Sequence, residues 1–108
     1  MHIRWLVPWH PIESDDERRG LLDEFQREVG RDHPLADIAV SPIARRQDCD
    51  DVLFSVADGR VAIVHLTWSG KTESNSELPI YHFFDSLEIF VEESMKPEHQ
   101  RWRSFPAS

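Results

Sequence analysis

Cysteine is nearly absent from this chain, since Cys49 is the only one. A lone cysteine forms no internal disulfide, so nothing in the sequence calls for an oxidising compartment. No apolar run approaches the roughly 20 residues that span a bilayer, which excludes a transmembrane helix. The N-terminal stretch MHIRWLVPWHP also lacks the apolar region and small-residue cleavage site of a signal peptide. We therefore expect a cytoplasmic protein that does not associate with membranes.

Positive charge is scarce as well. The chain has 20 acidic residues against 12 Lys and Arg, which gives a formal net charge of −8. Binding to a phosphate backbone needs clustered Lys and Arg, whereas the basic residues here form no more than short pairs, such as Arg45-Arg46 and, near the C-terminus, Arg101 with Arg103. The sequence therefore predicts no nucleic-acid binding, and it favours basic over acidic protein partners.

The composition that remains is that of one ordinary globular domain. Hydrophobic residues make up 40% of the 108 positions and charged residues 30%, which is typical of neither a disordered chain nor a membrane protein. A chain of this length buries enough surface for one core. We predict a single domain over residues 1–108, with residues 1–10 as an N-terminal arm and residues 96–108 as a C-terminal tail.

Two helices are predicted from capping signals and apolar spacing. Ser14 and Glu17 fit a capping box, and Gly30 is a plausible stop for the helix that they open. The second helix begins at Asp85 or Ser86 and ends before Pro97. The apolar residues at helical spacing are Leu21, Leu22, Phe25 and Val29 in the first helix, and Leu87, Phe90, Val91 and Met95 in the second.

The remaining apolar segments are predicted strands. They span residues 3–7, 38–46, 51–57, 60–68 and 80–84, and residues 69–79 form a polar loop. Pro42 cannot donate to a ladder, so it belongs at an edge or a bulge. Short links between consecutive strands imply an antiparallel sheet. The predicted fold is α+β, in β-α-β-β-β-β-α order: an antiparallel sheet of about four strands with two helices packed on one face.

The strongest local signal is the Asp58-Gly59 pair between two apolar runs, which predicts a β-hairpin. A two-residue turn sets Val52 opposite His65, whereas a three-residue turn with a glycine bulge sets Asp51 there. In the first register both hairpin faces are mostly apolar, and such a surface does not stay bare. Its cover is either the aromatic termini or a second copy of the chain in a homodimer. The aromatic residues of the termini are Trp5, Trp9, Trp102 and Phe105.

Reactive side chains gather around this hairpin without completing a known motif. The candidate ligand or partner site consists of Cys49, Asp50, Asp51, His65, Trp68 and His82. Cys49 and His65 form the one conceivable nucleophile–base pair, but the carboxylates beside Cys49 disfavour its thiolate. His82, between two apolar residues, is predicted to be a hydrogen-bonded core histidine. No ligand pair stands at a diagnostic spacing, so we predict no catalytic residue, no metal site and no cofactor.

The block DDVLFSVADGRVAIVHLTWSG, followed by Pro79 and the run FFDS, resembles a group of small uncharacterised bacterial proteins over about residues 14–95. This resemblance implies a bacterial origin and no activity. We expect a small acidic protein that acts without catalysis, through a protein-binding surface made of the second sheet face and the acidic hairpin base. The alternative is a small enzyme or a ligand- or metal-binding protein whose pocket includes Asp50, Asp51, His65, Trp68 and His82.

Overall fold

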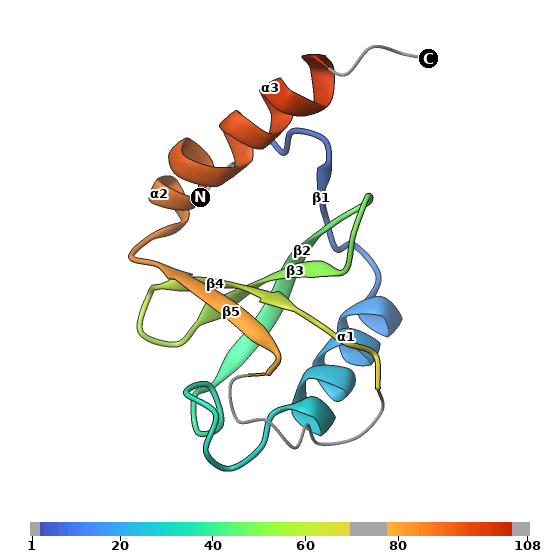
Figure 1. Ribbon diagram of the computed structural model, residues 1–108, viewed down its shortest axis with the longest axis vertical. Helices are drawn as coiled ribbons and strands as arrows, with labels where there is room; N and C mark the ends of the chain where they lie inside the picture. The colour runs from blue at the N-terminus through green and yellow to red at the C-terminus, as the bar shows by residue number, and fades with distance from the viewer. Residues whose placement is uncertain (1–2, 70–77, 105–108) are drawn as a thin grey trace.

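The computed structural model describes residues 3–69 and 78–104. Within these residues a single antiparallel sheet has five strands in chain order (Figure 1). They are β1 (Trp9–Pro11), β2 (Val40–Arg46), β3 (Asp51–Val56), β4 (Val61–His65) and β5 (Ile80–Phe84). The α+β class and the antiparallel sheet are confirmed. The sheet has five strands where about four were expected. Most of the predicted 69–79 loop lies outside the described residues.

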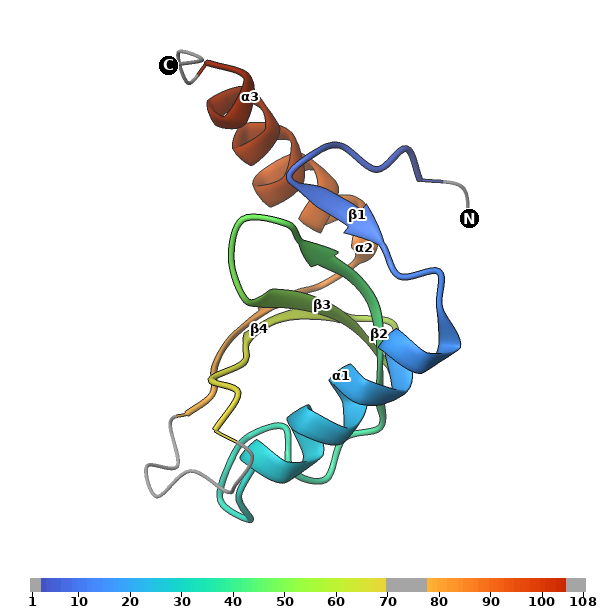
Figure 2. The same ribbon diagram turned by 90° about the vertical axis from the view of Figure 1, so that its right-hand side faces the viewer.

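The helices lie on both sides of the sheet. One side carries α1 (Asp15–Glu28), and the other carries a continuous helix of three parts, α2 (Leu87–Phe90), η1 (Val91–Met95) and α3 (Lys96–Ser104). Figure 2 shows the sheet between α1 and this second helix. The prediction that both helices pack on one face is therefore wrong. Both sheet faces are apolar, and a single helical layer covers only one of them.

Neighbouring side chains of β3 point to opposite faces and enter separate cores. Val52 and Phe54 pack toward α1, whereas Leu53 packs toward the C-terminal helix. The buried residues of the first core are Ile12, Leu21, Phe25, Leu35, Val52, Phe54, Val64 and Leu66. Those of the second core are Trp9, Ala44, Leu53, Val61, Phe84, Phe90 and Met95. This division explains why the hairpin is apolar on both sides.

The N-terminal arm helps to cover the second core. Ile3, Trp5 and Leu6 pack against it, and Trp9 is 1% exposed. Of the two covers considered for the second face, the termini are thus present within one chain, although Phe105 lies outside the described residues. The predicted strand at residues 3–7 is wrong, because the backbone turns where the N–H of Trp9 donates to the carbonyl of Leu6. Pairing with the sheet begins only at β1.

Both predicted helix starts are confirmed. The hydroxyl of Ser14 accepts the N–H of Glu17 at the start of α1, and the hydroxyl of Ser86 accepts the N–H of Ile89 at the start of α2. The Glu17 carboxylate does not close the capping box, because it bonds to Arg45 of β2. The register of β2 against β3 shifts between Pro42 and Ala44, as expected for a bulge at proline.

The second helix does not stop at Pro97, so the predicted C-terminal tail is helical as far as Ser104. Immediately before this proline, η1 is a π-helical turn, in which the N–H of Lys96 reaches back to the carbonyl of Val91. Pro97 has no N–H to donate inside this continuous helix, and the π-helical turn that precedes it accommodates the loss. Among the described residues, no helix combines the length and apolar character that crossing a bilayer requires.

Candidate functional site

The hairpin turn decides which side chains meet at its base. Gly59 has φ +98°, which glycine adopts without strain, and the N–H of Val56 donates to the carbonyl of Arg60. The turn therefore has three residues and a glycine bulge. This is the second of the two registers considered, in which Asp51 stands opposite His65. Compared with the two-residue register, this shift by one residue turns each β4 side chain to the opposite face of the sheet relative to β3. Val52 therefore shares its face with Val64 and not with His65.

Asp51 and His65 form a carboxylate–imidazole pair. Nδ1 of His65 lies 2.9 Å from Oδ1 of Asp51, and the His65 side chain is 49% exposed. A carboxylate on Nδ1 orients the ring and leaves Nε2 as a base. A base alone is not a complete catalytic set, since it needs a nucleophile or a bound water to act on.

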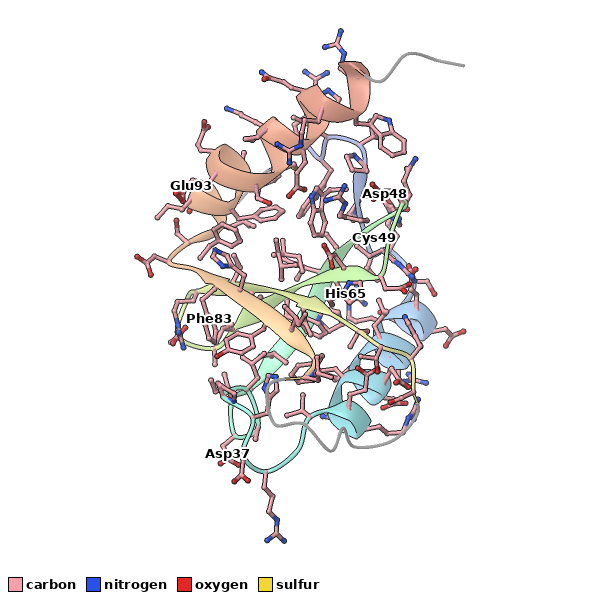
Figure 3. All side chains as sticks on the ribbon, in the orientation of Figure 1. Asp37, Asp48, Cys49, His65, Phe83 and Glu93 are labelled. Carbon is pink, nitrogen blue, oxygen red and sulfur yellow. The ribbon has the colours of Figure 1, made fainter. Side chains whose placement is uncertain are left out.

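Cys49 is not activated by its surroundings. It is exposed in the loop between β2 and β3 (Figure 3), yet partial desolvation raises the pKa of its thiol. The negative charges of Asp51 and Asp48 raise that pKa further, against the opposing effects of a hydrogen bond from the Asp51 backbone and of the positive charge of Arg46. The thiol form is therefore favoured, as the flanking carboxylates led us to expect.

The other predicted site residues do not complete the pair. The backbone carbonyl of Asp50 accepts the N–H of Leu66, and its side chain is exposed. The backbone N–H of Trp68 donates to Glu28 of α1, which lies on the opposite side of the sheet from His65. His82 lies on the same sheet face as His65, but its ring is exposed and contacts the Phe84 ring edge-to-face, with the ring centroids 4.6 Å apart. The prediction of a core histidine at position 82 is wrong, because β5 is an edge strand.

A metal site is not assembled either. Among the described residues, no three His, Cys, Asp or Glu side chains are grouped closely enough to hold an ion.

Sequence reasoning missed a buried acid, Glu28 at the end of α1. Its carboxylate is 0% exposed and accepts the N–H groups of Thr67 and Trp68, both at 2.8 Å. Burial raises the pKa of Glu28, and a hydrogen bond with the nearby Glu24 raises it further, while the two N–H groups oppose this. Trp68 has φ +58°, an uncommon conformation for a residue other than glycine. Glu28 thus fixes the turn that presents Trp68, which is 45% exposed.

The signal for this acid was present in the helical pattern. Glu28 stands three residues after Phe25 and seven after Leu21, so it lies on the buried face of α1. A glutamate on an apolar stripe predicts a buried carboxylate that needs a donor. The donors come from a loop about 40 residues away in sequence, and the helix itself gives no information about them.

A second polar cluster, also missed, joins the two ends of the chain. Glu98 of α3 accepts hydrogen bonds from the indole of Trp9 and the hydroxyl of Ser94, and it pairs with Arg46 at 3.1 Å. The guanidinium of Arg46 also binds Asp48 through two hydrogen bonds, which lowers the pKa of that carboxyl. Glu98 therefore connects the arm, the sheet and the C-terminal helix.

Two hollows of the described surface bear on function. One, of about 390 Å³, lies where β5 meets the second helix. Another, of about 460 Å³, lies between the arm and that helix. An enzyme at the hairpin base would need a cleft that contains His65 and Trp68. Neither of these two hollows is lined by either residue.

Comparison with known proteins gives no functional assignment, because no family model, no curated protein and no solved structure matches the chain. The bacterial resemblance of the hairpin block remains a prediction.

Proposed function

We propose that this is a non-catalytic, cytoplasmic protein that binds a partner protein by pairing β5 with an extended, basic segment of that partner. The observation that carries this proposal is the outer edge of β5, the last strand of the sheet, with which no other described strand pairs and where Ile80 is 62% exposed. The surface differs from the one expected from the sequence, because the second sheet face is covered by the chain itself.

An open edge strand presents unpaired N–H and C=O groups to any other extended chain. Proteins usually protect such edges with Lys, Pro, inward-pointing charges or bulges. The segment IYHFF from Ile80 to Phe84 contains no proline and no Lys, Arg, Asp or Glu. No described strand or helix pairs with its outer edge (Figure 1). Addition of a strand from a partner satisfies these groups and covers Ile80.

The hollow at the end of β5 suggests the charge of that partner. Its walls combine apolar side chains with the exposed carboxylates of Asp85 and Glu93. The lining residues are His82, Phe83, Phe84, Asp85, Ile89 and Glu93. A Lys or Arg side chain fits this combination, because its stem packs on apolar surface while its charged end meets a carboxylate. The net charge of −8 favours the same class of partner.

Self-association through β5 is the competing outcome. A second copy brings an uncharged strand flanked by the same acidic side chains, so Asp85 and Glu93 gain no positive partner from that strand. We therefore favour a different, basic protein over a homodimer.

Site-specific photocrosslinking in cells tests this proposal. A photoreactive amino acid at Ile80 is expected to trap a discrete protein, crosslinked within a segment that contains Lys or Arg. The matched control places the same amino acid at Asp23, which is exposed on α1. Adducts of the chain with itself would support a homodimer. The proposal fails if both positions give the same adducts or if Ile80 gives none.

The Asp51–His65 pair supports one other candidate, a small hydrolytic enzyme in which His65 acts as a base on a bound water. A screen of activated esters and phosphoesters tests it. Activity that disappears in His65→Ala and persists in His82→Ala would contradict the non-catalytic hypothesis. His82 is the matched control, because it is an exposed histidine on the same face.

A further inference from the structure

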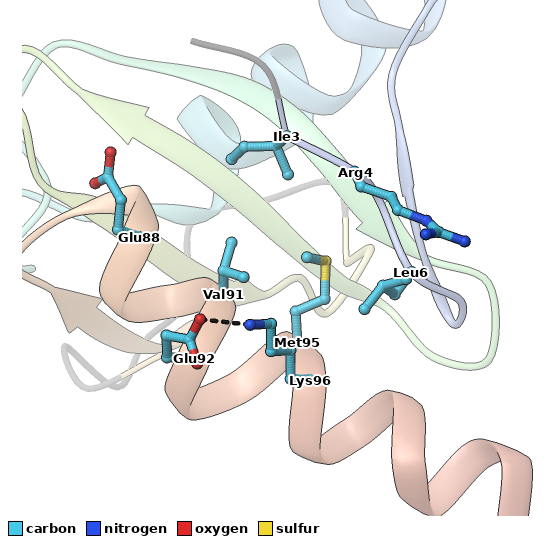
Figure 4. A pocket seen from close by; sticks show the side chains of 8 residues that line it. All are labelled: Ile3, Arg4, Leu6, Glu88, Val91, Glu92, Met95 and Lys96. Atoms are coloured by element: carbon cyan, nitrogen blue, oxygen red, sulfur yellow. Dashed lines mark hydrogen bonds and ion pairs between the residues drawn. The ribbon is translucent and has the colours of Figure 1, made fainter.

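A hollow of about 460 Å³ separates the N-terminal arm from the second helix (Figure 4). Its apolar walls come from Ile3 and Leu6 on the arm and from Val91 and Met95 on the helix. Binding sites for small molecules have volumes of about 300–1,000 Å³ and mostly apolar walls with a few polar groups. The hollow has both properties.

The helical wall of this hollow is the π-helical turn η1. Val91 and Met95 are its first and last residues. Met95 is fully buried and Val91 partly so, which ties the wall to the second core. Turns of this kind are rare and occur often at functional sites. The wall is thus a defined part of the fold, and the opposite wall is the arm.

Four charged side chains line this hollow, and two of them pair with each other. Glu92 and Lys96 form an ion pair with each other, so their charges largely cancel. Arg4 is exposed and forms no salt bridge with any residue in the described ranges. Figure 4 shows Arg4 and Glu88 at opposite ends of the hollow. An anionic group is therefore favoured at the Arg4 end and disfavoured at the Glu88 end.

We propose that this hollow binds a small amphipathic carboxylate, such as a medium-chain fatty acid. The alkyl chain lies against Ile3, Leu6 and Val91, and the carboxylate meets the guanidinium of Arg4. This site is separate from the β5 edge and does not depend on the function proposed for it.

Calorimetric titration with sodium decanoate below its micelle concentration tests the proposal. Decanoate is expected to bind about 15-fold more tightly than octanoate, because each buried methylene contributes about 0.8 kcal/mol. In Glu88→Gln, which removes the acidic end of the hollow, decylamine is expected to bind at least about tenfold more weakly than decanoate, since its ammonium then has only Arg4 as a charged neighbour at the ends of the hollow.

Two variants, each with a matched control, locate the site. Arg4→Gln is expected to weaken decanoate binding about tenfold, and Arg31→Gln, at another exposed arginine, is expected to leave it unchanged. Val91→Trp fills the hollow and abolishes binding, whereas Ile89→Trp, elsewhere on the same helix, does not. If Val91→Trp fails to fold by circular dichroism, Arg4→Gln decides. The proposal is overturned if decanoate binds more weakly than about 1 mM, if Glu88→Gln binds decylamine as well as decanoate, or if Arg4→Gln has no effect.

Discussion

Replacement of Glu28 tests how far a buried acid controls the turn after β4. The carboxylate holds two backbone N–H groups that belong to Thr67 and Trp68. Glu28→Ala leaves both donors without this acceptor and creates a small cavity. Glu28→Gln keeps the size and one carbonyl oxygen, so one N–H still has an acceptor.

The magnitudes follow from these contacts. A buried N–H group that loses its acceptor costs about 1–3 kcal/mol, and less when water reaches it. Thr67 and Trp68 are partly accessible. We therefore expect Glu28→Ala to lower the free energy of unfolding by about 2–4 kcal/mol and Glu28→Gln by about 1–2 kcal/mol near pH 4.5. In a domain of this size, 1 kcal/mol changes Tm by about 4–8 °C.

The pH dependence has a definite sign. The pKa of Glu28 is raised in the fold, so the folded protein binds a proton that the unfolded chain has already released. The resulting stabilisation is complete below the unfolded pKa and is lost as the pH rises through the folded pKa. The difference in unfolding free energy between the wild type and Glu28→Gln is therefore expected to shrink from pH 4.5 upward, by no more than about 1.4 kcal/mol per pH unit.

Urea denaturation from pH 4 to pH 8 measures this difference. Asp23→Asn, at an exposed carboxylate on the same helix, controls for the change in charge. Amide hydrogen exchange gives a second readout, because the N–H groups of Thr67 and Trp68 are expected to exchange faster in Glu28→Ala. A difference that grows as the pH rises would refute the reasoning, since it would mean that the fold prefers the ionised carboxylate.

Three other substitutions have expected costs that chemical denaturation can measure. Gly59→Ala meets no atom within 4 Å of the added Cβ but forces φ +98° on a side chain, so it should cost about 1–2 kcal/mol; no change would mean that the turn relaxes. His33→Ala removes the ring that bonds the carbonyl of Pro79 and the N–H of Leu35, at about 2–3 kcal/mol, and a smaller cost would indicate that water replaces it. Glu98→Ala leaves Trp9 and Arg46 without their shared acceptor, which should lower the free energy of unfolding by about 2–4 kcal/mol. The tryptophan fluorescence of this variant should also change, because the indole of Trp9 loses its hydrogen bond.

The parts of the fold that depend on neighbouring residues could be predicted from the sequence. Ser14 and Ser86 cap their helices as expected, because a cap needs only an N–H three residues away. Pro42 stands at the expected bulge, and Gly59 makes the hairpin turn. The turn length could not be fixed, because Asp58-Gly59 suits two- and three-residue turns equally well.

The parts that depend on distant residues were missed or wrong. Residues 3–7 have the composition of a strand, but they pack on the second core, and the carbonyl of Val7 bonds to His99 of α3. Pro97 is a stop signal that the π-helical turn before it accommodates. The same distinction between local and distant contacts holds at the candidate site. The pairing of Asp51 with His65 follows from the hairpin register, whereas the donors to Glu28 come from a distant loop and could not be predicted from the helix.

The central claim is that the open edge of β5 receives an extended, basic strand. NMR titration of the isotopically labelled protein with a short peptide of alternating Val and Lys tests it most directly. Shift changes are expected to concentrate at Ile80–Phe84, Asp85 and Glu93 with this peptide, and to be absent with the matching peptide of Val and Glu. No binding, equal binding of the two peptides, or changes confined to the Asp51–His65 pair would contradict it.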